Sequence, residues 1–176
     1  MNKPKIFIAC DTTNLTKVKE IINQSKTKKI KIGYKFGLEF MNSKKGRQFI
    51  SSLKNKIIFV DLKLNDTVNT MLSAVKALKD LKINYLTVHI SSGLAALRAV
   101  KKVSGLTIIV GVTTLTSLNN KDLKLIGYNK SVKNLVLHQA KLARQSALDA
   151  LVCSPHEVND VRKIFKKEII TPGVQI

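Results

Sequence analysis

Aromatic residues and cysteines are scarce in this chain, and each shortage argues against a class of protein. Aromatic residues make up 5% of the sequence and do not alternate with the basic residues, so no platform for stacking nucleic-acid bases is evident. The two cysteines, Cys10 and Cys153, each end an apolar run. We therefore expect reduced core thiols in a cytoplasmic protein, and no disulfide framework.

Long apolar segments are also missing. No run approaches the ~18 apolar residues that cross a membrane, and residues 1–10 lack the apolar segment and cleavage site of a signal peptide. The first apolar run is not followed by the Gly-x-Gly-x-x-Gly pattern of dinucleotide-binding proteins. Histidine, cysteine and carboxylate residues nowhere show metal-ligand spacing, so we expect no metal site.

Basic residues, by contrast, are abundant: 31 Lys and Arg against 11 Asp and Glu give a formal net charge of +20. Only four of the 31 are arginine, which is the better residue for bidentate recognition of phosphates and bases. The lysines are spread along the whole chain. We therefore expect a solvated lysine-rich surface with neither nucleic acid nor membrane as a partner, and a functional basic field is the alternative.

Short apolar runs alternate with segments whose apolar residues recur at helical spacing. This alternation predicts an α/β protein with a parallel sheet of right-handed β-α-β units, in one domain over residues 1–176. The expected strands are Lys5–Cys10, Ile30–Lys35, Ile57–Leu62, Tyr85–Ile90, Thr107–Val112, Ala150–Cys153 and Glu168–Thr171. The expected helices are Leu15–Gln24, Gly46–Lys54, Val68–Leu81, Leu94–Val103, Val132–Ser146 and Glu157–Phe165.

Polar residues recur where these strands end, and this favours a (β/α)8 TIM barrel over a doubly wound sheet, because such barrels build their sites there. A barrel of this kind needs eight strands, whereas the sequence stops at Ile176, just after the seventh. We therefore expect a barrel truncated after its seventh strand, with the C-terminal eighth βα unit missing. An open sheet is the alternative.

The strongest functional signal follows the third expected strand, where Asp61 and Lys63 stand at the end of a buried run and share one face by period-two alternation. Opposite charges at such a position are costly unless they are paired and used. Asp11 and Lys35 end the two preceding strands. The four side chains are expected to form a row of alternating charge, which suits chemistry in which charge relocates.

The end of the third expected strand and the residues after it read Asp61-x-Lys63-x-x-Asp66, followed by Thr67 and Asn69-Thr70. Further segments in the same order along the chain are Ile8–Asp11, Tyr34–Glu39, Val88–Gly93, Val112–Ser117, Leu151–Glu157 and Thr171–Val174. Together they resemble the motifs of orotidine 5'-phosphate decarboxylase. The Asp-x-Lys-x-x-Asp element alone is shared with sugar-phosphate decarboxylases and lyases of the same suprafamily, so the other segments carry the distinction.

The resemblance implies cofactor-independent decarboxylation of orotidine 5'-phosphate to UMP, in de novo pyrimidine biosynthesis, by a homodimer. Lys63 would stabilise the carbanion and donate the proton, and Asp66 with Thr67 would reach the partner's site. The implied catalytic residues are Lys63, Asp61, Asp66 and Lys35. The implied substrate-binding residues are Asp11, Lys35, Asp61, Lys63, Asp66, Thr67, Asn69, Thr70, Thr116, Ser117 and Gln175.

The sequence also departs from the family pattern. Gln175 stands where the family has an arginine, and the family's phosphate contacts follow the eighth strand, so little or no activity is expected from residues 1–176 alone. An inactive truncated form, a Mg²⁺-dependent sugar-phosphate enzyme and a nucleic-acid-binding basic protein are the alternatives. Simpler roles are also open at single positions: capping of a helix by Asp66, Thr67 and Asn69, a turn at Thr116 and Ser117, and a structural hydrogen bond at His89.

Overall fold

The computed structural model describes residues 5–173, and within them it contains seven strands whose order in the sheet is the order of the chain. The pairings of β1 with β2, β2 with β3, β5 with β6 and β6 with β7 are parallel. This order is the one expected for a (β/α)8 barrel through its seventh strand. The strands are β1 (Lys5–Ala9), β2 (Lys31–Gly37), β3 (Ile57–Leu64), β4 (Tyr85–His89), β5 (Ile108–Val112), β6 (Ala150–Val152) and β7 (Glu168–Ile170).

All six helices expected from apolar spacing are present, and two of them, α1 and α5, have the expected bounds. Two short α-helices, α2 and α6, and three 3₁₀ turns were not predicted. The α-helices are α1 (Leu15–Gln24), α2 (Leu38–Met41), α3 (Gly46–Ser52), α4 (Val68–Ala77), α5 (Leu94–Val103), α6 (Asn120–Leu125), α7 (Val132–Gln145) and α8 (Val158–Ile164). The 3₁₀ turns are η1 (Lys79–Leu81), η2 (Ile90–Ser92) and η3 (Pro155–Glu157).

The expected bounds were wrong where local hydrogen bonding overrides apolar spacing. The helix expected to reach Leu81 ends at Ala77, because the chain tightens into η1 and then turns at Lys82 with a left-handed φ of 48°. Helix α6 begins at a capping box, in which Asn119 accepts the N–H of Asp122 and the Asp122 carboxylate accepts the N–H of Asn119. Strand β2 continues two residues beyond Lys35, to Gly37.

The chain divides into two compact units, and the first comprises Met1–Leu62 and Ala77–Leu86. Its core is rich in rings: Phe7 meets Phe59 and Tyr85 edge-on, with ring centroids 5.0 and 4.9 Å away. Gly33 makes room for this cluster, because a Cβ there would lie 2.7 Å from the Phe7 ring.

The strand register of the first unit brings polar strand ends together. Ala9 pairs with Lys35 between β1 and β2, and Gly37 pairs with Asp61 between β2 and β3. Because neighbouring parallel strands are about 4.8 Å apart, residues at matching ends lie within reach of one another's side chains. The register therefore places Lys35 between the ends of β1 and β3.

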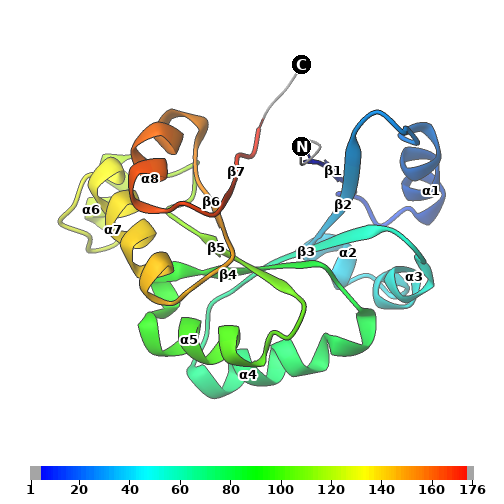
Figure 1. The fold of residues 1–176 in the computed structure, drawn as a ribbon, viewed down its shortest axis with the longest axis horizontal. Helices are drawn as coiled ribbons and strands as arrows, with labels where there is room; N and C mark the ends of the chain where they lie inside the picture. Colours follow the sequence, from blue (N-terminus) through cyan, green and yellow to red (C-terminus); the bar gives the residue numbers. More distant parts are fainter. Residues whose placement is uncertain (1–4, 174–176) are drawn as a thin grey trace. The chain divides into compact units, whose positions relative to one another are not determined.

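The second unit comprises Lys63–Lys76 and Thr87–Ile176. Helices α7 and α8 pack together, as Figure 1 shows, and the fully buried Val136, Val161 and Phe165 lie on them or at their ends. Asp149 ties α5 to β5, because its carboxylate accepts the N–H of Ile109 at 3.0 Å and the ammonium of Lys101 at 2.7 Å. One domain over residues 1–176 stays a prediction.

Cys10 and Cys153 are free and buried, as the sequence predicts. Burial raises the pKa of each thiol to about 11, and the charge of Asp11 adds to the rise at Cys10 while that of Glu157 adds to it at Cys153. A thiol with so high a pKa carries little thiolate at neutral pH. Both cysteines are therefore packing residues.

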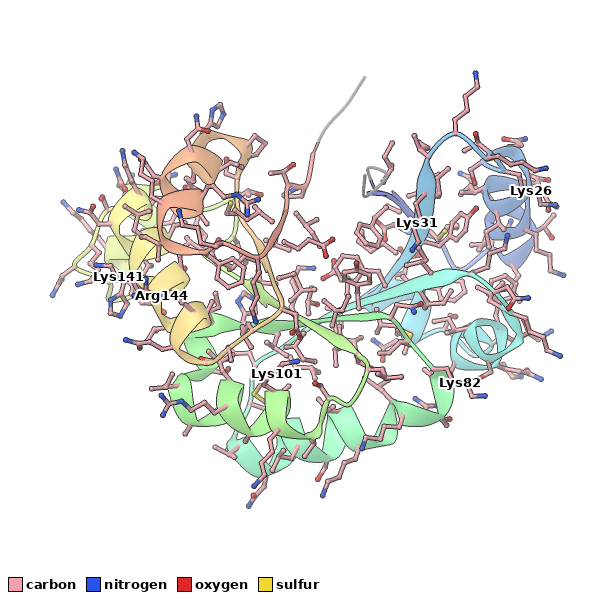
Figure 2. All side chains as sticks on the ribbon, in the orientation of Figure 1. Lys26, Lys31, Lys82, Lys101, Lys141 and Arg144 are labelled. Carbon is pink, nitrogen blue, oxygen red and sulfur yellow. The ribbon has the colours of Figure 1, made fainter. Side chains whose placement is uncertain are left out.

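The basic side chains project from separate elements of the surface. Figure 2 labels Lys26 and Lys82 in the first unit and Lys141 with Arg144 on α7, and all four side chains are exposed. This distribution matches the spread of lysines along the sequence. Among residues 5–173, no helix combines the length and the apolar character that crossing a membrane requires.

Candidate active site

Three charged side chains meet at the carboxyl ends of β1, β2 and β3. Lys35 Nζ lies 3.2 Å from Asp11 Oδ1 and 3.6 Å from Asp61 Oδ2, so one ammonium bridges two carboxylates. The side chain of Asp11 is 55% exposed, that of Lys35 24% and that of Asp61 12%. The sequence argument from neighbouring strands predicts this contact, and the three residues form a graded path from solvent to a nearly buried carboxylate.

Burial makes the two ion pairs unequal. The Lys35–Asp11 pair is open to water on the Asp11 side, and exposed pairs contribute little because solvent screens them. Asp61 is held away from solvent, where a nearby ammonium is needed to offset the cost of desolvating the charge. Lys35 therefore acts mainly on Asp61, and Asp11 offers an accessible carboxylate beside it.

A glycine at the end of β2 lets the Asp11 carboxylate lie against the backbone. A Cβ built at Gly37 would come within 3.3 Å of Asp11 Oδ1, which is tighter than ordinary side-chain contact. With any larger residue there, the Asp11 carboxylate would have to shift by a few tenths of an ångström. Gly37 therefore helps to fix the geometry of the pair.

Near the end of β3, the backbone of Lys63 adopts a conformation that is rare for a residue with a side chain, with a φ of +50°. Left-handed geometry costs an L-residue roughly 1–2 kcal/mol and persists where the surroundings impose it. The N–H of Lys63 donates to Thr87 Oγ1 at 2.8 Å, and Thr87 is 1% exposed. The regular alternation of side chains along β3 therefore stops at Lys63. That Lys63 and Asp61 point to the same face of the sheet stays a prediction.

The segment after β3 is exposed and internally bonded. Asp66 Oδ1 accepts the N–H of Thr67 at 2.6 Å, and the hydroxyls of Thr67 and Thr70 lie 3.0 Å apart. The carbonyl of Thr67 accepts the N–H of Met71 and so opens α4. Thr67 therefore occupies the helix-capping position, which the simpler sequence interpretation expects, while Asp66, Asn69 and Thr70 present polar atoms to solvent.

The segment after β5 is anchored at its start. Thr113 donates its hydroxyl to the carbonyl of Val152 at 2.8 Å. Gln139, which is 6% exposed on α7, accepts both the N–H and the hydroxyl of Thr114 through one oxygen, at 2.7 and 3.1 Å. Thr116 and Ser117 follow as exposed residues inside a backbone turn closed by the Leu118 N–H and the Leu115 carbonyl. A turn, which is the simpler of the two sequence interpretations at Thr116 and Ser117, is therefore present.

The predicted site residues thus fall into three groups. Asp11, Lys35 and Asp61 contact one another in the first unit. In the second unit lie Lys63, Asp66, Thr67, Asn69, Thr70, Thr116 and Ser117. Gln175 lies outside the described residues. The functional roles assigned to all of them stay predictions.

Two polar residues that sequence reasoning missed support this second group: Thr87 and Gln139. Each is polar at a position where apolar spacing predicts burial, within the run Leu86-Thr87-Val88 and on the inner face of α7. A buried polar group needs a hydrogen-bond partner, so a lone polar residue in an apolar run is the signal that could have identified them. In residues 5–173, no three histidine, cysteine or carboxylate side chains are grouped to hold a metal ion.

Comparison with known proteins gives one family. Residues 4–176 match the Orotidine 5'-phosphate decarboxylase / HUMPS family. The curated orotidine 5'-phosphate decarboxylase of Prochlorococcus marinus (strain MIT 9215) is 36% identical over 189 residues, which cover 99% of this chain and 76% of that protein. The predicted resemblance is therefore confirmed.

Solved structures show the same likeness. The crystal structure of orotidine 5'-phosphate decarboxylase from Lactobacillus acidophilus superimposes with a TM-score of 0.87 at 29% identity, covering 98% of this chain and 82% of that one. The structure of orotidine 5'-monophosphate decarboxylase from Methanocaldococcus jannaschii, complexed with the inhibitor BMP, gives a TM-score of 0.81 at 21% identity and covers 98% and 79%. The predicted fold class, a (β/α)8 barrel through its seventh strand, is confirmed.

Proposed function

The chain belongs to the orotidine 5'-phosphate decarboxylase / HUMPS family, and we propose that it decarboxylates orotidine 5'-phosphate to UMP, without a cofactor, in pyrimidine biosynthesis. One observation carries the proposal beyond the family: Lys35 bridges Asp11 and the nearly buried Asp61, on the strand that continues to Lys63. Such a fixed array of charges suits a reaction in which charge moves within the substrate. The free, buried thiols agree with a cytoplasmic location.

The chemistry explains why an ammonium is needed. Loss of CO₂ breaks the bond between C6 and the carboxylate and leaves the electron pair on C6, in the ring plane, where the ring carbonyls do not delocalise it. An ammonium beside C6 stabilises this pair and then transfers a proton to it. We assign this role to Lys63, whose amine regains a proton from water before the next turnover.

The three residues of the first unit then have complementary roles. Asp61 lies near the leaving carboxylate and orients the ammonium, while Lys35 holds Asp61 in place and donates to the ribose. Asp11, the most exposed of the three, accepts from the ribose hydroxyls. Its exposure supports this role because a substrate group can replace water there.

We also assign substrate or partner roles to exposed residues of the second unit. Thr116 and Ser117 contact the pyrimidine edge, Asn69 and Thr70 contact the substrate, and Asp66 with Thr67 reach the site of a partner subunit in a homodimer. The exposure of all six side chains supports these roles, since each is available to a ligand or a second chain.

The direct test is the fall in ultraviolet absorbance as orotidine 5'-phosphate becomes UMP, measured on a version of the chain extended through an eighth βα unit that supplies the family's phosphate contacts. Lys63→Ala is expected to lower kcat by roughly 10²–10⁴-fold, the usual contribution of a positioned acid. Lys141→Ala is the matched control, because that lysine is exposed on the outer side of α7 (Figure 2) and should leave kcat within about twofold. Undiminished turnover in Lys63→Ala would contradict the assigned role.

The homodimer can be tested by mixing two inactive variants. If Asp66 serves the partner's site, a heterodimer of Asp66→Asn with Lys63→Ala contains one site in which both residues are native. Mixing should then restore part of the activity, whereas no recovery, with mixed dimers verified by mass spectrometry, would refute a site shared between subunits.

The family description also covers HUMPS enzymes, so a sugar-phosphate decarboxylase is the second candidate. Turnover of a sugar phosphate that is abolished by EDTA, with none of orotidine 5'-phosphate, would favour it. Binding of BMP without turnover of either substrate would identify an inactive form. Steeply salt-dependent binding to RNA or DNA without nucleotide turnover would favour a nucleic-acid-binding protein.

A further inference from the structure

The backbone of Lys63 is held by a side chain, and that side chain belongs to Thr87 on β4. In a regular parallel ladder, the N–H groups of a strand donate to backbone carbonyls of the neighbouring strands. Here the N–H of Lys63 donates to Thr87 Oγ1 at 2.8 Å, while Lys63 itself adopts a left-handed φ of +50°. A hydroxyl thus takes the position of a carbonyl at the residue whose side chain carries the proposed chemistry.

Thr87 is well suited to act as a fixed acceptor. Its side chain is 1% exposed, so bulk water does not compete for the hydroxyl. Threonine is branched at Cβ, which restricts rotation about χ1 and keeps the hydroxyl in one place once the methyl group is packed. The flanking Leu86 and Val88 are fully buried and anchor the strand on both sides.

The φ angle of Lys63 decides the direction in which its Cα–Cβ bond leaves the chain, and therefore the region that its ammonium can reach. Relaxation to an extended φ, which an L-residue otherwise favours, would turn that bond away. We propose that Thr87 is a positioning residue, whose buried hydroxyl holds the Lys63 backbone in the left-handed conformation that aims the proton-donating ammonium at C6. This inference rests on the proposed function of Lys63.

The test compares Thr87→Val, which keeps the shape and removes the acceptor, with Thr87→Ser, which keeps the hydroxyl. Thr87→Val should raise the amide hydrogen exchange rate of Lys63 by roughly tenfold, the usual effect of losing one neutral hydrogen bond. It should also lower kcat for orotidine 5'-phosphate by roughly tenfold or more with KM within about twofold, since misplacing a reacting group costs turnover more than binding. Thr87→Ser should restore most of both.

Thr113→Val is the matched control. Thr113 is also 1% exposed, and its hydroxyl also bonds to the main chain at 2.8 Å, but to Val152. This variant should lose a similar share of stability while leaving the exchange rate at Lys63 unchanged. Equal acceleration at Lys63 in both variants would mean general loosening and would overturn the proposal.

Two other results for Thr87→Val would also overturn the proposal. One is an unchanged amide exchange rate at Lys63, and the other is a faster exchange rate with an unchanged kcat. If the native sequence, extended through the eighth βα unit, shows no turnover, the proposed function has failed. Amide exchange at Lys63 and the affinity for BMP then test the role of Thr87 separately. In that case, the positioning role is supported if Thr87→Val binds BMP more weakly than Thr87→Ser does and also shows faster amide exchange at Lys63. Equal binding of BMP by the two variants rejects it.

Discussion

Lys35 should couple far more strongly to Asp61 than to Asp11, although it contacts both. Its ammonium is closer to Asp11, at 3.2 Å, than to Asp61, at 3.6 Å. Distance alone would therefore rank the Asp11 pair first. Solvent reverses this order, because the Asp11 side chain is 55% exposed and that of Asp61 only 12%.

The magnitudes follow from Coulomb's law and screening. At 3.6 Å and an effective dielectric constant of about 20, the Lys35–Asp61 pair attracts by roughly 4–5 kcal/mol before desolvation is subtracted. Desolvation of both ions removes a large part of this, and a coupling energy of about 2 kcal/mol is expected. The Lys35–Asp11 pair faces water, and exposed pairs give about 0.2–1 kcal/mol.

Two double-mutant cycles measure these couplings by urea unfolding. One cycle combines Lys35→Met with Asp61→Asn, and the other combines Lys35→Met with Asp11→Asn, so that the shared substitution cancels in the comparison. Both asparagine variants keep the size of the side chain. A coupling at Asp11 equal to or above that at Asp61 would refute the claim that burial, and not distance, ranks the two pairs.

Three further outcomes are expected. Gln139→Met should lower the free energy of unfolding by about 2 kcal/mol, because it removes the acceptor shared by the N–H and hydroxyl of Thr114; a variant as stable as the native protein in urea would contradict this. Hydrogen bonds from Lys133, and to a smaller extent from Lys163, lower the pKa of Asp160 to about 2 in the folded protein. The ionised carboxylate therefore stabilises the fold fully above its unfolded pKa near 4, and this contribution is lost as the pH falls toward 2. Asp160→Asn should therefore unfold at lower urea concentration than native protein at pH 6, and the difference should vanish near pH 2; a difference independent of pH would refute the linkage. Burial raises the thiol pKa of Cys10 and Cys153 to about 11. Iodoacetamide at pH 8 should therefore alkylate both thiols at least roughly a hundredfold more slowly in the folded than in the unfolded protein. Mass spectrometry measures the two rates, and equal rates would contradict this prediction.

The strands and longer helices could be predicted because burial dictates their composition. Runs such as Ile57–Val60 leave no polar face, and α1 and α5 repeat apolar residues at helical spacing over their whole length. The single turn of α2 and the short α6 could not be found in this way, since neither is long enough to show a period. Their stability comes from local bonds, such as the Asn42 side chain donating to the Leu38 carbonyl at 2.9 Å.

In the candidate site, too, one part could be predicted from the sequence and another could not. Lys35 was expected to meet Asp11 and Asp61 because strand ends of neighbouring parallel strands adjoin, and this contact depends only on strand order. The left-handed φ of Lys63 and its bond to Thr87 depend on one torsion angle at the end of β3, which no pattern of residue types reports. Sequence therefore indicates which side chains gather, whereas the aim of a single side chain needs the structure.

The strand order also bears on how the chain assembles. Each recorded pairing joins a strand to the one immediately before it in the sequence, as between β1 and β2 or β6 and β7. A strand leaving the ribosome thus finds its neighbour already made, and contacts between nearby parts of a chain are the ones that form fastest. Synthesis and folding can advance together, one βα unit at a time, and the Asp11–Lys35–Asp61 contact would be complete before most of the second unit is made.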